Sequence, residues 1–194
     1  MHVDFLSYPD SRIRLSLNTF DSHQFACVAR ATVSFRSMDV VVRQLMKCSP
    51  DEYLDFVMDV ERYAEVDDKI TSISWIRREG DVVRFRFRPA LPGLPRPMPR
   101  MVLQLTLVAG ERIDLRLAPL PMNKFGNRVM TYTGSFVCTP ADGGTLVTSS
   151  TTLEVIPVLR WLIEPILRRT LPANFQAEIE HAKSYIEARS AYNS

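Results

Sequence analysis

The stretch SPDEYLDFVMDVERYAEVDD, residues 49–68, is rich in titratable side chains, since eight of its twenty residues are acidic. Paired carboxylates can act as a general acid and base, and clustered carboxylates can bind a hard cation. Asp51, Asp55 and Asp59 are spaced by four, which places them in a row along one face of a helix. A hard cation draws its oxygen ligands mainly from loops, and a straight helical row does not supply that geometry. We therefore interpret the row as the solvated side of a packed helix, and we predict no metal site.

The same stretch carries the signals that start a helix. Ser49 is a good N-cap residue, Pro50 suits the first helical position, and Glu52 completes a capping box with Ser49. Apolar residues then recur at the spacing of a single helical face, at Leu54, Val57 and Met58. We predict a helix that begins at Pro50, followed by a second short helix or turn over residues 60–68.

The composition excludes several classes of protein. With 194 residues, 46% of them apolar and 24% charged, the chain fits one soluble globular domain. A formal net charge of +2 indicates no general affinity for nucleic acid, and we predict no DNA partner. No apolar run approaches the roughly 18 residues of a membrane span, and the N-terminus lacks the apolar core of a secretory signal.

The cysteines indicate a reducing compartment. Cys27, Cys48 and Cys138 are odd in number and form no C-x-x-C pair, so we expect neither a zinc knuckle nor a disulfide framework. We interpret them as small apolar core residues. Free thiols fit the cytoplasm, where we expect the protein to be located, and we predict no cofactor.

Hydrophobic periodicity predicts one strand before the helical stretch and six after it, with glycine-containing turns between neighbouring strands. A rigid loop with five prolines, 89–99, separates two of the hairpins. The predicted strands are 38–47, 70–78, 81–89, 101–109, 112–120, 128–139 and 145–156.

Residues 1–37 fit this pattern poorly, although 12–17 and 27–37 alternate like short strands. We expect them to form a loosely attached extension or an extra edge strand. Met38 is then an alternative start of the native chain, and residues 38–190 form the main domain.

The chain ends in a long amphipathic helix over residues 157–190. Its apolar face is predicted from two groups of residues. Pro165 lies within the first group and Pro172 lies between the groups, and both are expected to kink or break the helix. The first group is Leu159, Leu162, Ile163 and Ile166, and the second is Phe175, Ile179, Ala182 and Ile186.

This order of elements resembles the START-like, helix-grip superfamily, which includes the polyketide cyclase/dehydrase, coenzyme-Q-binding and Bet v 1-type families. The resemblance covers about residues 38–190. Its local carriers are SPDEYLDFVMDVERYAEV, which contains Asp59-x-x-x-Tyr63, and the hairpin CTPADGGTLVTSSTTLEV.

The resemblance implies an α+β fold: a curved, seven-stranded antiparallel sheet wrapped around the C-terminal helix, with two short helices after the first strand. It also implies a cavity between sheet and helix that holds a hydrophobic small molecule such as a lipid, a quinone or a polyketide. A filled core is the alternative that the sequence leaves open. The predicted ligand-binding residues are Tyr53, Val57, Phe85, Phe87, Leu103, Leu105, Leu115, Leu117, Ser149, Thr151, Leu162, Ile166, Phe175 and Ile179.

Catalysis in such a cavity requires polar groups, and the strands offer a few. Arg128 could stabilise an enolate and Tyr132 could donate a proton, with Thr133 as a further candidate. Strands also carry threonine and tyrosine for their β-propensity alone, so these residues have a purely structural interpretation as well.

Seven arginines lie within residues 77–100, where only Glu79 and Asp81 oppose them. Arg84, Arg86 and Arg88 alternate with apolar residues and point to the outer face of the sheet, where they could touch an anionic membrane or RNA. A charged outer face that keeps the sheet soluble is the simpler interpretation. The segment LRWLIEPILRRTL, 159–171, could similarly dip into a membrane interface.

We therefore predict a protein that binds or transports a hydrophobic small molecule. The first alternative is a polyketide cyclase- or dehydrase-like enzyme. The second is a ribosome- or protein-interacting module, because DVERY, 59–63, resembles the coenzyme-Q-binding group, which also contains ribosome-association toxins.

Overall fold

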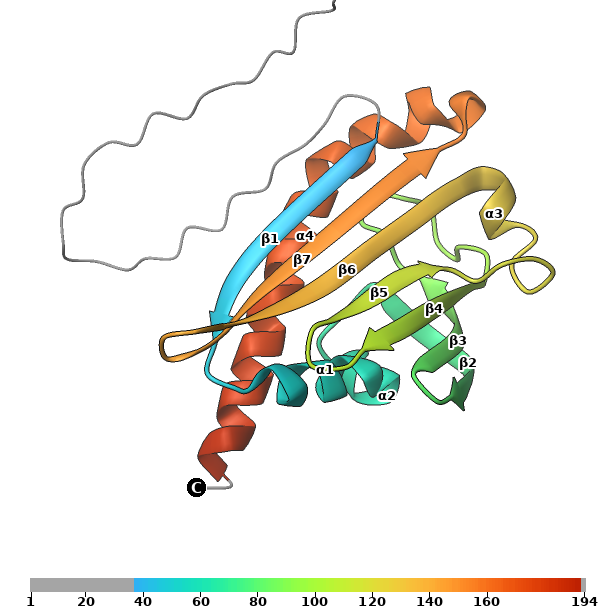
Figure 1. The fold of residues 1–194 in the computed structure, drawn as a ribbon. Helices are drawn as coiled ribbons and strands as arrows, with labels where there is room; N and C mark the ends of the chain where they lie inside the picture. The colour runs from blue at the N-terminus through green and yellow to red at the C-terminus, as the bar shows by residue number, and fades with distance from the viewer. Residues whose placement is uncertain (1–36, 193–194) are drawn as a thin grey trace, which may run out of the picture.

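Alternating side chains build the sheet. In β3 (Val82–Pro89), Val83, Phe85 and Phe87 are buried, while Arg86 between them is exposed. The computed structural model describes residues 37–192 and shows one antiparallel sheet with a long helix, α4 (Pro157–Tyr192), lying across one face of it (Figure 1). This is the predicted helix-grip arrangement.

The seven strands follow the order β1-β7-β6-β5-β4-β3-β2, and all neighbours are antiparallel. Each strand after the first therefore pairs with its neighbour in sequence, and β1 closes the sheet against β7. The other strands are β1 (Met38–Met46), β2 (Ile70–Glu79), β4 (Met101–Val108), β5 (Arg112–Leu117), β6 (Met130–Ala141) and β7 (Gly144–Val155).

The two predicted helices after the first strand are present. Ser49 caps α1 (Pro50–Met58), since its hydroxyl accepts a hydrogen bond from the Glu52 amide at 3.2 Å. Asp59 then caps α2 (Val60–Tyr63) through its carboxylate. The capping box thus begins the helix where the sequence placed it.

A third short helix, α3 (Gly126–Val129), was not predicted. It occupies the residues just before β6, so the strand begins at Met130 and not at residue 128. The predicted N-terminal extension, residues 1–37, lies outside the described residues except for Ser37, and its status stays a prediction.

Helix α4 is continuous across Pro165 and Pro172, although Figure 1 shows that its first turns run in a different direction from the rest. Continuity fixes which side chains face the sheet. At about 3.6 residues per turn, the nine residues from Ile166 to Phe175 are two and a half turns, which puts the two on opposite sides.

The buried stripe of α4 is therefore not the predicted one. It comprises Leu167, Leu171, Phe175, Glu178, Ile179, Ala182 and Ile186. The prediction that Leu162 and Ile166 face the sheet is wrong, because in a continuous helix both lie on the side away from Phe175. Leu162 is 52% exposed, and Ile166 is only half-buried.

Candidate functional site

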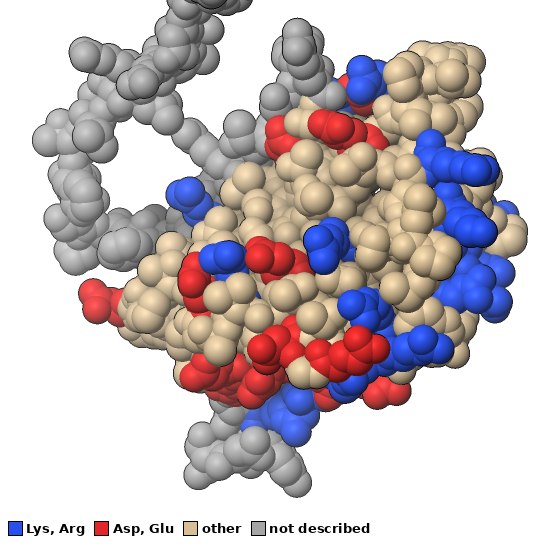
Figure 2. All heavy atoms as spheres, turned by 45° about the vertical axis from the view of Figure 1, so that its right-hand side comes forward, with Lys and Arg blue, Asp and Glu red and all other residues tan. Residues whose placement is uncertain are grey.

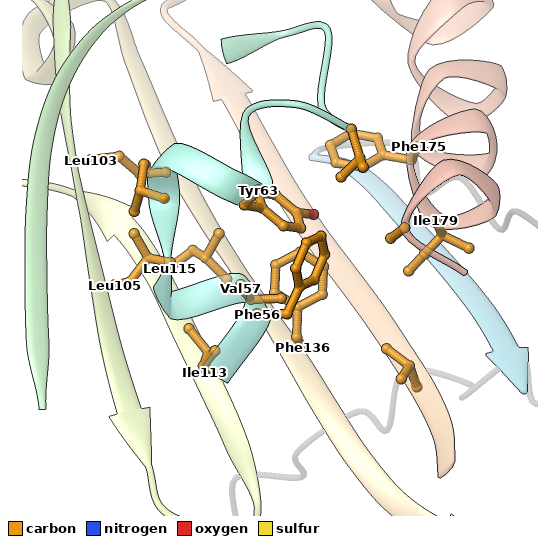
Figure 3. Packing of buried hydrophobic residues seen from close by; sticks show 14 of the residues in the cluster. Phe56, Val57, Tyr63, Leu103, Leu105, Ile113, Leu115, Phe136, Phe175 and Ile179 are labelled. Atoms are coloured by element: carbon orange, nitrogen blue, oxygen red, sulfur yellow. The ribbon is translucent and has the colours of Figure 1, made fainter. Parts of the chain in front are cut away.

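A cavity of about 100 Å³ lies between the inner face of the sheet and the helices α2 and α4. Figure 3 shows how the side chains converge there: Leu103, Leu105 and Leu115 approach from the strands, and Phe175 approaches from α4. The hydroxyl of Tyr63 points toward α4 in the same view. Sheet and helix thus enclose a space that side chains do not fill.

Most of the cavity wall is apolar, and nine of the predicted ligand-binding residues contribute to it. The alternation in β3, β4 and β5 directs every second side chain inward, and Leu117 at the end of β5 is half-buried. The predicted ligand-binding residues that line the cavity are Val57, Phe85, Phe87, Leu103, Leu105, Leu115, Leu117, Thr151 and Phe175.

One part of the wall is polar, and its centre is a buried ion pair. The Lys69 ammonium lies 2.5 Å from Oε2 of Glu178 on α4 and 2.6 Å from Oδ1 of Asp67. Both carboxylate side chains are more than nine-tenths buried. The ammonium also lies 4.7 Å from the centre of the Phe175 ring, so cation–π attraction adds to the ionic contacts.

Two tyrosines extend this polar region. The Tyr63 hydroxyl donates a hydrogen bond to Oε1 of Glu178, so both oxygens of that carboxylate have a partner. Tyr132 enters the wall from β6, and Thr151 enters it from β7. We call Tyr63, Asp67, Lys69 and Glu178 the polar cluster.

Burial affects the pKa of Glu178, Lys69 and Tyr132 in this region. Burial raises the pKa of Glu178 and Asp67 raises it further, while Lys69 and Tyr63 act in the opposite direction. Burial alone would lower the pKa of Lys69, but the charges of Glu178 and Asp67 hold it above its usual range. Burial, reinforced by Glu178, raises the pKa of Tyr132 to about 12. Lys69 therefore stays protonated, and Tyr132 stays a neutral hydrogen-bond donor.

Several predicted site residues lie elsewhere. Tyr53, Ser149 and Ile179 are buried but do not line the cavity. Leu162 is exposed, and Ile166 faces the proline loop, since a side chain at Gly93 would meet its Cγ2 at 2.5 Å.

Of the two catalytic candidates, Tyr132 lines the cavity and Arg128 does not. Arg128 belongs to α3 and is exposed, because the helix displaces the start of β6 past it. Thr133 is exposed on β6. The predicted placement of Arg128 on an inward-facing strand is wrong.

The polar cluster was missed by the sequence-based prediction, although one signal was available. Glu178 falls three residues after Phe175 and one before Ile179, so it lies on the buried stripe of the helix. A charged residue on an apolar face indicates a paired or functional group. Asp67 and Lys69 lie in an irregular segment before β2, where no periodicity tells which way a side chain points.

The acidic row on α1 behaves as a solvated face. Asp51 and Asp55 are exposed, and Asp59 lies 4.0 Å from Arg62 and 3.6 Å from Arg78. Across residues 37–192, no group of three or more His, Cys, Asp or Glu side chains is arranged to hold a metal ion.

The predicted basic face is on the outside of the sheet. Arg84 is held by Glu79 at 2.8 Å and by Gln104 at 2.9 Å, while Arg86 is exposed. Arg88 is half-buried. These side chains do not reach the cavity.

Comparison with known families agrees with this architecture. Residues 37–187 match the family described as polyketide cyclase/dehydrase and lipid transport. The chain belongs to this family. It thereby belongs to the START-like, helix-grip superfamily, and its role is hydrophobic ligand binding or a cyclase-like reaction.

Several solved structures are similar to this one over most of the chain. A protein from Thermus thermophilus has a TM-score of 0.63 and 19% identity, covering 78% of this chain and 99% of that one. The Zhui aromatase/cyclase from a Streptomyces species has a TM-score of 0.61 and 13% identity, covering 79% and 96%. Norcoclaurine synthase from Thalictrum flavum has a TM-score of 0.53 and 13% identity, covering 85% and 98%. At these identities the likeness establishes the fold alone.

No curated protein matches the sequence. Among the described residues, no helix has the length and apolar character needed to cross a membrane.

Proposed function

We propose that this protein binds a small hydrophobic molecule in the cavity, with the polar end of that molecule directed at the polar cluster. The observation that supports this most is the uneven wall of the cavity, which is mainly apolar along the sheet and carries its charged groups near Lys69 and Glu178. Apolar burial supplies affinity in such a site, and the few polar groups fix orientation. The free, buried thiols of Cys48 and Cys138 support the cytoplasm as the place of action.

The size of the cavity limits the ligand. An engineered apolar cavity of about 150 Å³ in another protein accommodates benzene, and the present cavity of about 100 Å³ is of the same order. A single aromatic ring or a short acyl segment therefore fits without rearrangement, and a larger polyketide or lipid requires the wall to move.

Two isosteric probes test the proposal. Toluene and phenol have nearly the same shape, but only phenol can form a hydrogen bond with the Lys69 ammonium or the Tyr132 hydroxyl. We expect both to bind. Lys69→Met should weaken the binding of phenol by up to about tenfold, the size of one hydrogen bond, and should leave toluene nearly unchanged. Calorimetric titration of both proteins with both probes measures this difference.

A matched pair of variants controls for location. Leu103→Trp adds bulk to the cavity wall, and Leu146→Trp adds the same bulk to a half-buried position on β7 outside that wall. We expect the first to abolish probe binding and the second to retain it. Mass spectrometry of molecules released by denaturing freshly purified protein would then identify the natural ligand. Failure of both probes to bind the wild-type protein would refute the proposal.

An enzymatic role is the second candidate, supported by titratable groups buried against the cavity. Lys69 could stabilise an enolate oxygen and Tyr132 could donate a proton, as in a cyclisation or dehydration of a β-polyketone. In that case Glu178→Gln should lose turnover of a β-polyketone while retaining binding. An equal loss of turnover and of binding in this variant would contradict the enzymatic role and would leave only the binding role.

A further inference from the structure

Large apolar side chains are exposed at one end of the molecule only, within the residues that the structure describes. All of them fall into two short segments, the loop before α3 and the first turns of α4. They are Leu120, Met122, Phe125, Val158, Trp161 and Leu162, with exposures from 40% for Met122 to 76% for Trp161. A soluble domain normally scatters such residues, so their concentration indicates an interaction surface.

The two segments belong to the same end of the sheet. The Ile156 amide, just before α4, donates a hydrogen bond to the Val129 carbonyl at the end of α3 with a length of 3.0 Å. The proline loop joins them, since the Thr170 hydroxyl donates to the Pro92 carbonyl at 3.3 Å. We call residues 90–100, 118–129 and 157–170 together the basic apolar end.

The charge of these three segments is almost entirely positive. They contain seven basic residues and a single carboxylate, Glu164. That carboxylate lies 3.4 Å from Arg160 and 2.5 Å from Arg168, so it is already neutralised within α4. Lys124, Arg128 and Arg169 are exposed. Figure 2 shows basic side chains gathered along the right-hand edge below an uncharged upper right corner, with acidic side chains near the top and, in larger number, in the lower half.

Helix α4 shows how the two properties combine. Val158, Trp161 and Leu162 are spaced as one face of its first turns, and Arg169 continues that face seven residues after Leu162. An exposed apolar face bordered by arginines is typical of a helix that lies in the interface of a bilayer. A protein partner of ordinary composition would not require so uniform a charge.

We propose that the basic apolar end docks on a membrane that contains anionic lipids. The exposed apolar side chains enter the boundary between headgroups and acyl chains, and the basic residues lie against the headgroup charges. The cavity wall reaches this end through Leu91, Leu117 and Met130, so docking places the cavity next to the lipid phase.

The acidic stretch 49–68 gives this docking a direction. It forms α1, α2 and the turn after them at the end opposite to α3 and the start of α4 (Figure 1). An anionic surface repels that end and attracts the other, so the molecule approaches in one orientation. The net charge of only +2 conceals this separation.

Co-sedimentation of the full chain with vesicles tests the proposal. We expect binding to vesicles of phosphatidylcholine with one quarter phosphatidylglycerol, and at least tenfold weaker binding to pure phosphatidylcholine or at 0.5 M salt. Replacing Lys124, Arg128 and Arg169 by Gln should lower the partition coefficient roughly fivefold per residue, about a hundredfold together. Trp161→Ser should lower it about tenfold.

A control with the same change in charge separates docking from general attraction. Arg77, Arg86 and Arg116 are exposed on the outer face of the sheet, and their replacement by Gln should change the partition coefficient less than tenfold. In the wild type, bound vesicles with brominated acyl chains should quench Trp161, and Trp161→Phe should remove that quenching. Trp75, the other tryptophan, serves as the internal reference.

Several results would overturn the proposal. One is no binding to the anionic vesicles, and another is equal loss of binding in the two triple variants. A third is vesicle binding without quenching of Trp161, which would indicate a polyanion site such as one for RNA. A fourth is a dimer in light scattering that Trp161→Ser converts to a monomer, because a second copy would then cover the surface. The toluene and phenol titrations do not involve this surface, so the two proposals fail separately.

Discussion

Replacing Lys69 by Met should destabilise the fold at neutral pH more than any single loss of a surface charge. The variant keeps an unbranched side chain of similar length and removes the ammonium, which lies over the Phe175 ring. Two carboxylates more than nine-tenths buried, Asp67 and Glu178, then lack a cation.

The distances set the size of the effect. At 2.5 Å and 2.6 Å, each contact is worth about 6 kcal/mol of gross attraction at an effective dielectric constant of about 20. Desolvation of the ammonium offsets much of this, and breaking a buried ion pair typically costs about 3–5 kcal/mol. For a domain of this size each kcal/mol shifts Tm by about 2–4 °C, so we expect a decrease of about 6–20 °C at pH 7.

The pH dependence follows from the pKa of Glu178, which burial and Asp67 raise and Lys69 lowers. In Lys69→Met no cation opposes the increase in the pKa of Glu178, so Glu178 binds a proton more tightly in the folded state than in the unfolded state. Stability then rises as pH falls from 7 toward the unfolded pKa, and the difference in Tm from the wild type should narrow between pH 7 and pH 5.

Thermal unfolding followed by circular dichroism at both pH values measures this difference. The double variant Lys69→Met/Glu178→Gln tests the cause, because it removes one of the two uncompensated charges. It should unfold at a higher temperature than Lys69→Met alone. A double variant no more stable than Lys69→Met, together with a Tm difference that is the same at both pH values, would refute the buried ion pair.

Two further predictions concern buried side chains. Tyr63→Phe should lower the free energy of unfolding by about 1.5–3 kcal/mol, because the Tyr63 hydroxyl donates a hydrogen bond to Glu178. Tyr53→Phe should leave the free energy of unfolding unchanged or raise it, since the buried Tyr53 hydroxyl has no hydrogen-bond partner among the described residues. Urea titrations that show equal losses in the two variants would contradict this prediction. Burial raises the pKa of Cys48 to about 11, with a contribution from Glu52, and burial raises the pKa of Cys138 to about 12. With the third cysteine replaced by serine, Ellman's reagent at pH 8 should therefore label neither thiol until urea unfolds the protein, and rapid labelling of the native protein would show that burial is incomplete.

The fold was predictable because its signals are local and repeated. Alternation assigns the strands, the capping box at Ser49 begins α1, and glycine turns join neighbouring strands into hairpins. In an antiparallel meander of this kind, adjacency in sequence becomes adjacency in the sheet. The turn before β7 shows how specific such signals are: a Cβ at Gly144 would lie 2.0 Å from the Met46 carbonyl oxygen, so only glycine fits.

The phase of α4 was not predictable from the first turns of the helix alone. The helix has apolar residues on two faces of its first turns, since Leu159 and Ile163 pack on the core while Val158 and Trp161 are exposed. Periodicity alone cannot decide which face is buried when both are apolar. Continuing the stripe backward from Phe175 in steps of four would have selected Leu171, Leu167 and Ile163. The prediction instead assigned the first turns from their own apolar spacing, and it expected Pro165 and Pro172 to kink or break the helix.

The acidic stretch contains solvated carboxylates and one buried carboxylate, and the structure separates them residue by residue. Along α1 and α2 the carboxylates follow the helix period, so their side chains are held on the wet side. Asp67 comes after the last helical residue, where the chain turns toward β2, and it is 6% exposed. The turn brings it beside Lys69, and Lys69 in turn reaches Glu178 on the far helix. Asp67 is thus the one carboxylate of the stretch that lines the cavity. It can do so because it lies in an irregular turn, where its side chain does not follow the helical period of the carboxylates on α1 and α2.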